Sequence, residues 1–380
     1  MQHISQGSAM ECHKVMQLSA KRAGLTITQA TDTSPGPGEI AVRVRAVAVN
    51  PFDRYVAAMG DVISGYLTCP VVPGSDVAGK VVAVGEAVTR FRVGDRVLGH
   101  AAGLEKSRNN PAEGGFQERV LLLDHMTSPI PDHLSFEQAA VLPLGLSTAA
   151  SSLFQKDFLG LPPPRIDPEP TGEVVIVWGG STSVGSNAIQ LAKAAGYDVV
   201  TTCSPRNNDY VVKLGANAVF DYRAAGVERQ IETALRGRRV AGAVAIGKGA
   251  AAACIDILAT CQGKRFVAQV TPPASFDDVT PGPGRWRTLP AFVKMAGGNL
   301  SLTMRAWRKG VATKMVWGSA LVENEVGPMI YETFLPDVLA SGRYLATPAP
   351  DVVGHGLESV PKAMERQRRG VSARKLVVTL

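Results

Sequence analysis

The sequence predicts an α/β protein in which a small β-barrel-like domain is joined to a doubly wound parallel sheet. From residue 173 onward, apolar runs of strand length alternate with segments of helical spacing, as in parallel sheets. Between residues 40 and 100, glycines separate short Val-rich strands, as in a twisted β domain. A last strand, KLVV from residue 375, is expected to return to the first domain.

The composition excludes several classes of protein. The 380 residues are 45% hydrophobic and include 39 glycines, which suits an α/β enzyme with two cores. No run of 18 uncharged apolar residues predicts a transmembrane helix, and the first 14 residues lack a signal-peptide core, so we expect a cytoplasmic protein. The net charge of +7 is modest and forms no nucleic-acid motif. It fits a phosphate-bearing cofactor or a substrate on an acidic carrier.

Five scattered cysteines form no C-x-x-C pair, so neither a disulfide framework nor a four-thiolate zinc site is predicted. The six histidines have no metal-ligand spacing either. These cysteines are Cys12, Cys69, Cys203, Cys254 and Cys261.

The first domain contains one strongly patterned strand and one capped helix. Apolar residues alternate strictly from Ile40 to Ala48, which marks a half-buried strand ending at Asn50. Ser135 and Gln138 have the spacing of a capping box and precede an apolar stretch. Pro143 is expected to break or bend that stretch.

A strand, turn, helix, strand unit from residue 173 to 205 predicts dinucleotide binding. The apolar run 174–178 leads into the turn GGSTSVG, and a helical pattern then ends at Gly196. The turn supplies Gly180, Thr182 and Gly185 where a G-x-G-x-x-G fingerprint has three glycines. In such units a pyrophosphate binds at the helix N-terminus. The alternative is a turn with only a structural role.

The end of the second strand favours NADPH over NADH. NAD enzymes place a carboxylate about 20 residues beyond the turn, whereas NADP enzymes place a small residue and a cation there. This chain has Cys203, Ser204, Pro205 and Arg206. The alternative for Arg206 is a solvated loop residue.

The segment from 271 to 320 interleaves methionines and tryptophans with cations. Such a segment could line an acyl pocket and meet phosphates, or it could be core packing with a solvated face. The residues are Met295, Met304, Trp307, Met315 and Trp317, with Arg305, Arg308, Lys309 and Lys314.

Ordered motifs along nearly the whole chain resemble the medium-chain dehydrogenase/reductase superfamily. They are PGSDVAGKVVAVG, VGDRVLG, GGF near 115, LPLGLSTA, LGA at 214–216, FDYR at 220–223 and the closing KLVV. Within it, the chain resembles the quinone oxidoreductase and enoyl reductase branch, especially the trans-acting enoyl reductases of fungal polyketide pathways. The resemblance implies a GroES-like catalytic domain formed by residues 1–150 and 325–380, and a Rossmann domain formed by residues 151–324.

The zinc ligands of the family's alcohol dehydrogenases are missing. Those enzymes have a Cys where this chain has Asn50, and His-Glu where it has Ser75-Asp76. The loop from 100 to 115 has none of the four cysteines of their structural zinc. We therefore predict no metal.

The resemblance also implies roles for individual residues. Asn50 would be an orienting amide, Tyr55 a hydrogen-bond donor or proton source, and Thr148 a hydroxyl beside the nicotinamide or substrate. Tyr66 is a second tyrosine candidate, and Tyr55 could instead be only a half-buried helix residue. The implied cofactor contacts are Gly180, Ser181, Thr182, Ser183, Val184, Gly185, Ser204, Arg206 and Tyr222. Tyr222 would lie against the adenosine phosphate, or would simply cap the sheet.

These expectations combine into an NADPH-dependent reductase that transfers hydride to the double bond of an α,β-unsaturated carbonyl compound. The expected substrate is an enoyl thioester in polyketide or other secondary metabolism, possibly presented by an acyl carrier protein or polyketide synthase. The alternatives are an NADPH:quinone oxidoreductase, a non-catalytic NADPH-binding protein and a zinc alcohol dehydrogenase. Both a monomer and a homodimer are compatible with the sequence.

Overall fold

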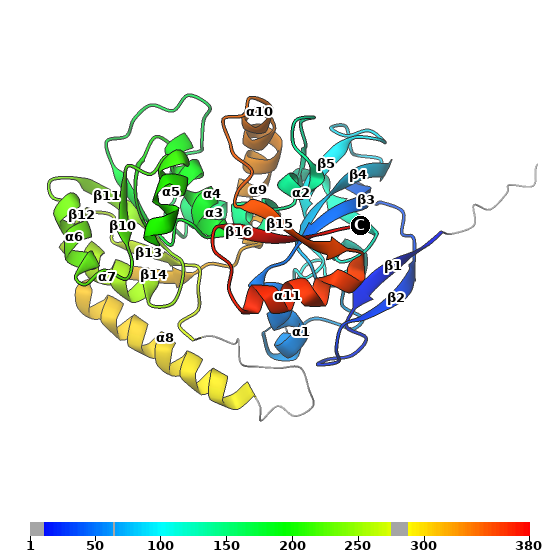
Figure 1. Cartoon of the computed structure of the whole chain (residues 1–380), viewed down its shortest axis with the longest axis horizontal. Coiled ribbons are helices and arrows are strands. Elements are labelled where there is room, and N and C mark those ends of the chain that lie inside the picture. Colours follow the sequence, from blue (N-terminus) through cyan, green and yellow to red (C-terminus); the bar gives the residue numbers. More distant parts are fainter. Residues whose placement is uncertain (1–10, 64, 275–287) are drawn as a thin grey trace, which may run out of the picture.

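The computed structural model describes residues 11–63, 65–274 and 288–380. Two seven-stranded sheets and a two-stranded hairpin account for the strands of these residues (Figure 1). One sheet is mostly antiparallel and belongs to the N-terminal and C-terminal parts of the chain, and the other is parallel and belongs to the middle. The predicted fold class is confirmed.

The first sheet is built around β3 (Glu39–Ala48), the strand predicted from its alternating pattern. Its strand order is β15-β16-β3-β4-β5-β7, and β6 also pairs with β3. The last strand, β16, pairs antiparallel with β3, so the chain returns to the first sheet as expected. The other bounds are β4 (Asp76–Val84), β5 (Arg96–His100), β6 (Arg119–Leu123), β7 (Thr127–Pro129), β15 (Ala349–His355) and β16 (Arg374–Thr379).

The hairpin β1 (Cys12–Gln17) and β2 (Thr26–Thr31) flanks this sheet. Below the sheet in Figure 1, helices α1 (Pro51–Ile63) and α11 (Val360–Arg368) lie side by side. Helix α1 begins three residues after β3 ends, so the turn between them brings Asn50 to the end of the central strand.

The parallel sheet has the strand order β10-β9-β8-β11-β13-β14. From β8 the sheet first grows in one direction, through β9 and then β10. The next strand, β11, lies on the other side of β8, so the strand order reverses there. In such sheets a ligand binds at the carboxyl ends of the strands, where the strand order reverses. The bounds are β8 (Val174–Trp178), β9 (Asp198–Cys203), β10 (Ala218–Asp221), β11 (Arg239–Ala245), β12 (Gln262–Gly263), which pairs with β11, β13 (Phe266–Gln269) and β14 (Ala312–Met315).

Helices cover both faces of the parallel sheet. Val175 and Val177 of β8 pack with α3 (Pro143–Phe154) and α4 (Ser183–Ala194), and Val174 and Ile176 pack with α6 and α7. A strand buried on both faces reads as a continuous apolar run, which is the pattern of residues 174–178. The remaining helices are α2 (Phe136–Ala139), α5 (Asn208–Lys213), α6 (Val227–Ala234), α7 (Ala250–Thr260), α8 (Leu289–Lys309), α9 (Val326–Pro328) and α10 (Leu335–Ala340).

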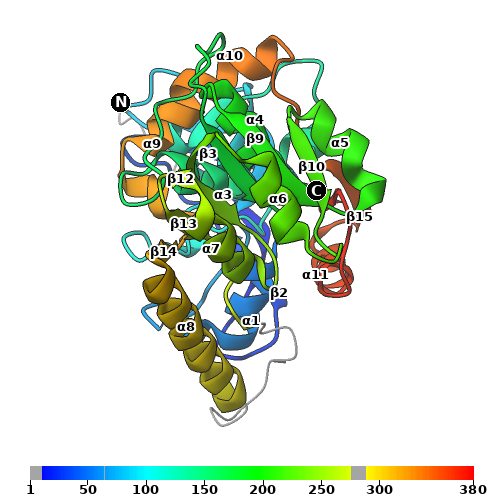
Figure 2. The ribbon, with the colours of Figure 1, turned by 90° about the vertical axis from the view of Figure 1, so that its left-hand side faces the viewer.

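The capping box and the proline break are confirmed. Ser135 and Gln138 make both hydrogen bonds of a capping box at the start of α2, and α3 begins at Pro143. Helix α8 was not predicted, because Gly297 and Gly298 interrupt its pattern. It runs 21 residues along the outside of the molecule, slanting away from the parallel sheet (Figure 2). No helix in the described part of the chain is long and apolar enough to cross a bilayer.

Candidate active site and cofactor site

The glycine-rich turn between β8 and α4 has the geometry of a phosphate-binding turn. Thr182 is the N-cap of α4, where its Oγ1 accepts a hydrogen bond from the Gly185 N–H at 3.0 Å. A Cβ on Gly185 would lie 2.2 Å from the Gly179 carbonyl oxygen, so this position requires glycine. The missing middle glycine is therefore explained, because Thr182 caps the helix through its side chain.

The first turn of α4 leaves polar groups available to a ligand. Thr182 is exposed, and Ser181, Ser183 and Val184 are half-buried. The Ser183 Oγ is buried and makes no hydrogen bond within the described residues. The N–H groups of a first helical turn have no partner inside the helix, and the helix dipole favours an anion there. These residues fit the pyrophosphate of a dinucleotide.

The carboxyl ends of β9 and β10 form a corner that suits a second phosphate. Cys203 and Asp221 are register partners, so Ser204 and Tyr222 follow them on adjacent strands. Arg206 is exposed, and the Arg223 guanidinium lies 5.1 Å from the centre of the Tyr222 ring. Arg223 was not among the predicted cofactor contacts, although it is the last residue of the FDYR motif.

Asn50 belongs to a buried polar cluster in the first domain. Its Nδ2 donates to Asp76 Oδ2 at 2.8 Å, and its Oδ1 accepts a hydrogen bond from Lys375 Nζ. Lys375 Nζ also lies 2.8 Å from Asp76 Oδ2. All three side chains are almost fully buried. Lys375 reaches this point because β16 pairs with β3, the strand that precedes Asn50.

A second carboxyl group adjoins this cluster. Asp53 is fully buried, and its Oδ2 accepts the Asn50 backbone N–H at 2.7 Å. Burial, with the nearby charge of Asp76, raises the pKa of Asp53 to about 7, although the Asn50 N–H and the Lys375 charge act in the opposite direction. A carboxyl group with this pKa exchanges its proton near neutral pH.

A chain of hydroxyl groups connects the first domain to α3. His100 Nδ1 lies 2.8 Å from Ser147 Oγ, which lies 2.8 Å from the Tyr331 hydroxyl. The Tyr331 hydroxyl also lies 2.9 Å from the Pro143 carbonyl, to which it can donate. Burial lowers the pKa of His100 to about 4, so the ring is neutral at physiological pH.

Thr148 lies at the junction of the two sheets. Its Oγ1 donates to the Leu144 carbonyl at 2.7 Å, and the Leu144 N–H donates to Asp76 at 2.6 Å. Asn50 and Thr148 are therefore connected through Asp76 and Leu144. A Cβ on Gly318 would lie 2.4 Å from Thr148 Oγ1, so the segment after β14 closes directly over this hydroxyl.

An aromatic and acidic cluster extends from this junction. The rings of Phe52 and Trp317 meet edge to face with centroids 5.2 Å apart. Trp317 Nε1 donates to Glu105 at 3.1 Å, and the Ser319 hydroxyl also donates to Glu105. Burial raises the pKa of Glu105. Glu105 thus joins a loop of the first domain to the segment that follows the last strand of the parallel sheet.

The two tyrosine candidates have different surroundings. Tyr55 is a half-buried residue of α1 that packs against Ala58, as do Ala291, Phe292 and Met295 of α8. The Tyr66 hydroxyl donates to the Leu104 carbonyl at 2.8 Å. The catalytic role of either residue stays a prediction.

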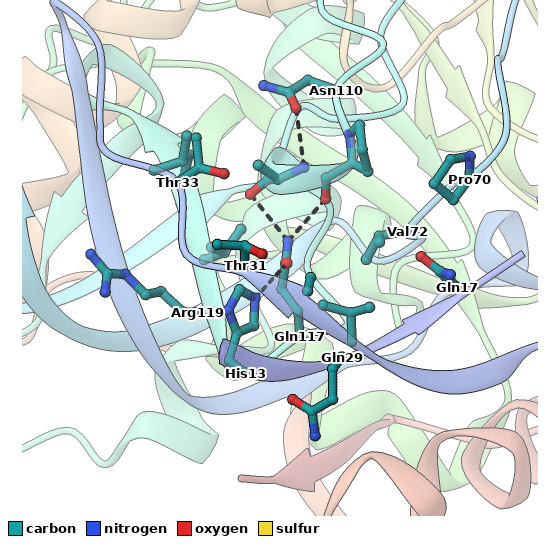
Figure 3. A pocket seen from close by; sticks show the side chains of 16 residues that line it. His13, Gln17, Gln29, Thr31, Thr33, Pro70, Val72, Asn110, Gln117 and Arg119 are labelled. Carbon is teal, nitrogen blue, oxygen red and sulfur yellow. Dashed lines mark hydrogen bonds between the residues drawn. The ribbon is translucent and has the colours of Figure 1, made fainter. Parts of the chain in front are cut away.

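A pocket of about 380 Å³ lies elsewhere, between the β1–β2 hairpin and the loop before β6 (Figure 3). None of the predicted site residues lines it. The Gln117 amide donates to the carbonyls of Pro111, Ala112 and Gly114, and its oxygen lies 3.1 Å from His13 Nε2. Gln117 and His13 are thus engaged in hydrogen bonds within the protein, and the pocket lies away from the predicted cofactor site. We therefore do not assign the reaction to this pocket.

The comparisons with known proteins agree with this geometry. The family model for the alcohol dehydrogenase GroES-like domain matches residues 36–132. The dehydrogenase pigH of Monascus ruber is 46% identical over 95% of this chain and 97% of its own length. The trans-enoyl reductase himH of Aspergillus japonicus is 36% identical over 90% of each chain. The chain belongs to the medium-chain dehydrogenase/reductase superfamily.

A solved structure of this superfamily, the CurK enoyl reductase, shares the fold of the chain. Its TM-score is 0.70 at 20% identity, and the match covers 97% of this chain and 99% of that one. The relatives that match nearly the whole chain are a dehydrogenase and an enoyl reductase, so the chain is an oxidoreductase of a superfamily whose members bind a nicotinamide dinucleotide. The exposed first turn of α4 and the corner beyond β9 and β10 fit such a cofactor.

The residues of this medium-chain dehydrogenase/reductase do not fit a zinc ion. The described ranges contain no cluster of three or more His, Cys, Asp or Glu side chains with metal-binding geometry. The buried cluster instead consists of the amide of Asn50, the carboxylate of Asp76 and the ammonium of Lys375, and an ammonium cannot be a metal ligand. The sequence motifs gave no sign of the Lys375 contact, because no local pattern relates residues 50 and 375.

Proposed function

We propose that this protein is an NADPH-dependent reductase that delivers hydride to the double bond of an α,β-unsaturated carbonyl compound, an enoyl thioester. The observation that carries the proposal is the buried cluster of Asn50, Asp76 and Lys375. By the resemblance given above, Asn50 takes the position of a Cys, and Ser75-Asp76 that of the His-Glu pair, in the zinc alcohol dehydrogenases. A reaction that builds negative charge on a carbonyl oxygen can be stabilised by hydrogen-bond donors without a metal.

The choice of NADPH rests on the corner beyond β9 and β10. Ser204 and Arg206 stand at the end of β9, where an NAD enzyme has a carboxylate for the ribose hydroxyl. The nearby Asp221 turns its side chain to the Arg223 N–H, so it does not occupy that role. Arg206 and Arg223 supply cations suited to a 2′-phosphate.

The chain's own residues orient the reactants and donate hydrogen bonds. When bound, the dihydronicotinamide supplies the hydride. The N-terminus of α4 would hold the pyrophosphate, and Phe52 and Trp317, whose rings meet edge to face, would offer an apolar surface to the substrate. Lys375 polarises the Asn50 amide through its oxygen, which strengthens the Nδ2–H donors of that amide.

The remaining requirements are a donor for the developing enolate oxygen and a proton for the α-carbon. Asn50 has a second Nδ2–H beyond the one that Asp76 accepts. We assign it to orienting the carbonyl, Tyr55 to donating the hydrogen bond or the proton, and Thr148 to contacting the nicotinamide or substrate. The relative himH, which is named a trans-enoyl reductase, supports an enoyl substrate. We further propose that this substrate is a thioester presented by a carrier protein of secondary metabolism.

The test is the oxidation of NADPH with a panel of acceptors. We expect turnover with crotonyl-CoA and with crotonyl-pantetheine, and slower turnover with simple quinones. Quinone reduction without any enoyl thioester reduction would instead support a quinone oxidoreductase. Tight NADPH binding with no acceptor reduced would support a non-catalytic binding protein.

A further inference from the structure

Helix α8 has an apolar stripe on its solvent side. Val293, Leu300 and Trp307 recur at every seventh residue, Leu289 lies four residues before Val293, and Ala296 and Thr303 occupy the positions between them at the spacing of a coiled-coil seam. At about 1.5 Å of rise per residue, the stripe is roughly 27 Å long. Its large members are exposed to the following extents: Leu289 49%, Val293 64%, Leu300 63%, Met304 44% and Trp307 81%.

The stripe is not the face with which α8 packs on the molecule. Leu302 and Ala306 pack with the core under α6 and α7, and Phe292 and Met295 pack against Ala58 of α1. On a helical wheel Met295 and Leu302 lie on the side opposite Val293, Leu300 and Trp307. Core packing, one of the two interpretations of this segment, is thus wrong for Trp307. A helix that is apolar on two opposite sides needs two partners, and the residues that the structure describes supply only one.

The charge of α8 selects the kind of partner. The helix contains four cations and no carboxylate. Arg305 and Lys309 are both paired with Asp256 of α7, whereas Lys294 and Arg308 have no ion pair with the residues that the structure describes. Two copies of α8 facing each other would bring like charges together, which disfavours self-association. An acidic helix would instead match both the stripe and its basic edge.

We propose that the stripe of α8 docks an acidic amphipathic helix of the carrier domain that presents the enoyl thioester. This inference rests on the proposed function. The position of α8 supports it, because Phe292 and Met295 in the N-terminal half of the helix pack against Ala58 of α1, the helix that starts beside Asn50. A carrier docked on the stripe would therefore be separated from α1 only by α8 itself. Trp307 is the expected anchor, since exposed tryptophans dominate the energy of such contacts.

The experiment compares one acyl group on two supports. The probes are crotonyl-pantetheine and the same crotonyl group on an isolated acidic acyl carrier protein. We expect a kcat/KM at least tenfold higher for the carrier-bound substrate. Trp307→Ala and Leu300→Asp should each remove most of that advantage and leave the rate with crotonyl-pantetheine unchanged. The matched control is Val212→Asp, which changes an exposed apolar residue of α5 and should affect neither substrate.

The outcomes separate the two proposals. Equal rates for the two supports, or an advantage that survives both α8 variants, would overturn the docking site while leaving the reductase intact. No turnover of either substrate would overturn the proposed function and, with it, this inference. Sedimentation of the wild type and Leu300→Asp adds a further check: a dimer that the substitution dissolves would assign the stripe to a second copy instead.

Discussion

Asp53 combines full burial with a pKa raised to about 7, which is unusual for a carboxyl group. Between pH 4 and 7 the unfolded chain has lost this proton and the folded chain keeps it. The stability contributed by Asp53 therefore falls as the pH rises, by about 1.4 kcal/mol for each pH unit in that window. His100 acts in the opposite sense, because its pKa is lowered to about 4 and its contribution is lost as the pH falls below its unfolded value.

The Asp53→Asn variant separates these contributions. Its amide oxygen can still accept the Asn50 N–H, but it carries no titrating proton. We expect the free energy of unfolding of the variant, minus that of the wild type, to increase from pH 4 to pH 7, as measured by urea denaturation. A difference that stays flat across this window would contradict the raised pKa of Asp53.

We propose that Ser204, at the end of β9, determines the preference for NADPH over NADH. Ser204→Asp puts a carboxylate at the end of β9, where it repels a 2′-phosphate and can bind the ribose hydroxyls. We expect the ratio of kcat/KM for NADPH to that for NADH to fall at least tenfold. Arg236→Gln removes an exposed cation elsewhere on the same domain and should leave the ratio unchanged. An unaltered ratio in Ser204→Asp would move the 2′-phosphate site away from this corner.

At the scale of the element, the β8–α4 turn depends on one close approach. A Cβ at Gly185 would lie 2.2 Å from the Gly179 carbonyl oxygen, whereas a Cβ at Gly297 in α8 would meet no atom within 4 Å. We expect Gly185→Ala to weaken NADPH binding at least tenfold in a fluorescence titration. Gly297→Ala should preserve binding and raise helix stability by about 1 kcal/mol. Equal affinities in the two variants would contradict the assigned turn.

Local patterns predicted the elements that their own residues determine. The run 174–178, the cap formed by Ser135 and Gln138 and the alternation of β3 all appear in the structure where the sequence indicated them. Helix α8 escaped prediction because Gly297 and Gly298 interrupt its pattern, and its contacts with α7 and α1 are formed only in the fold.

At the scale of the molecule, Glu105 joins a loop of the antiparallel-sheet domain to the segment that follows the parallel sheet. It holds Trp317 and Ser319, which follow the last strand of the parallel sheet. In a double-mutant cycle of Glu105→Ala and Trp317→Phe, we expect a coupling energy of roughly 1–2 kcal/mol from thermal unfolding. We also expect Glu105→Ala to raise KM for the acceptor more than it changes kcat. Additive effects of the two substitutions would mean that the hydrogen bond between Glu105 and Trp317 does not stabilise the contact between the two domains.

Contacts between residues far apart in the chain could not be predicted from the sequence. Lys375 meets Asn50 and Asp76 only because the last strand pairs with β3, and no local pattern indicates that pairing partner. The family motifs did predict that the parallel-sheet domain is inserted into the β domain and that the last strand returns to the first sheet. The predicted domain limits near residues 150 and 325 and the roles of Tyr55 and Thr148 stay predictions.

The most direct test of the account is the rate of crotonyl-CoA reduction with NADPH, measured before and after exhaustive dialysis against a chelator. Because the buried cluster of Asn50 and Asp76 contains the ammonium of Lys375 and no set of metal ligands, the rate should be unchanged by dialysis. A rate that disappears with the chelator and returns on addition of zinc would contradict it.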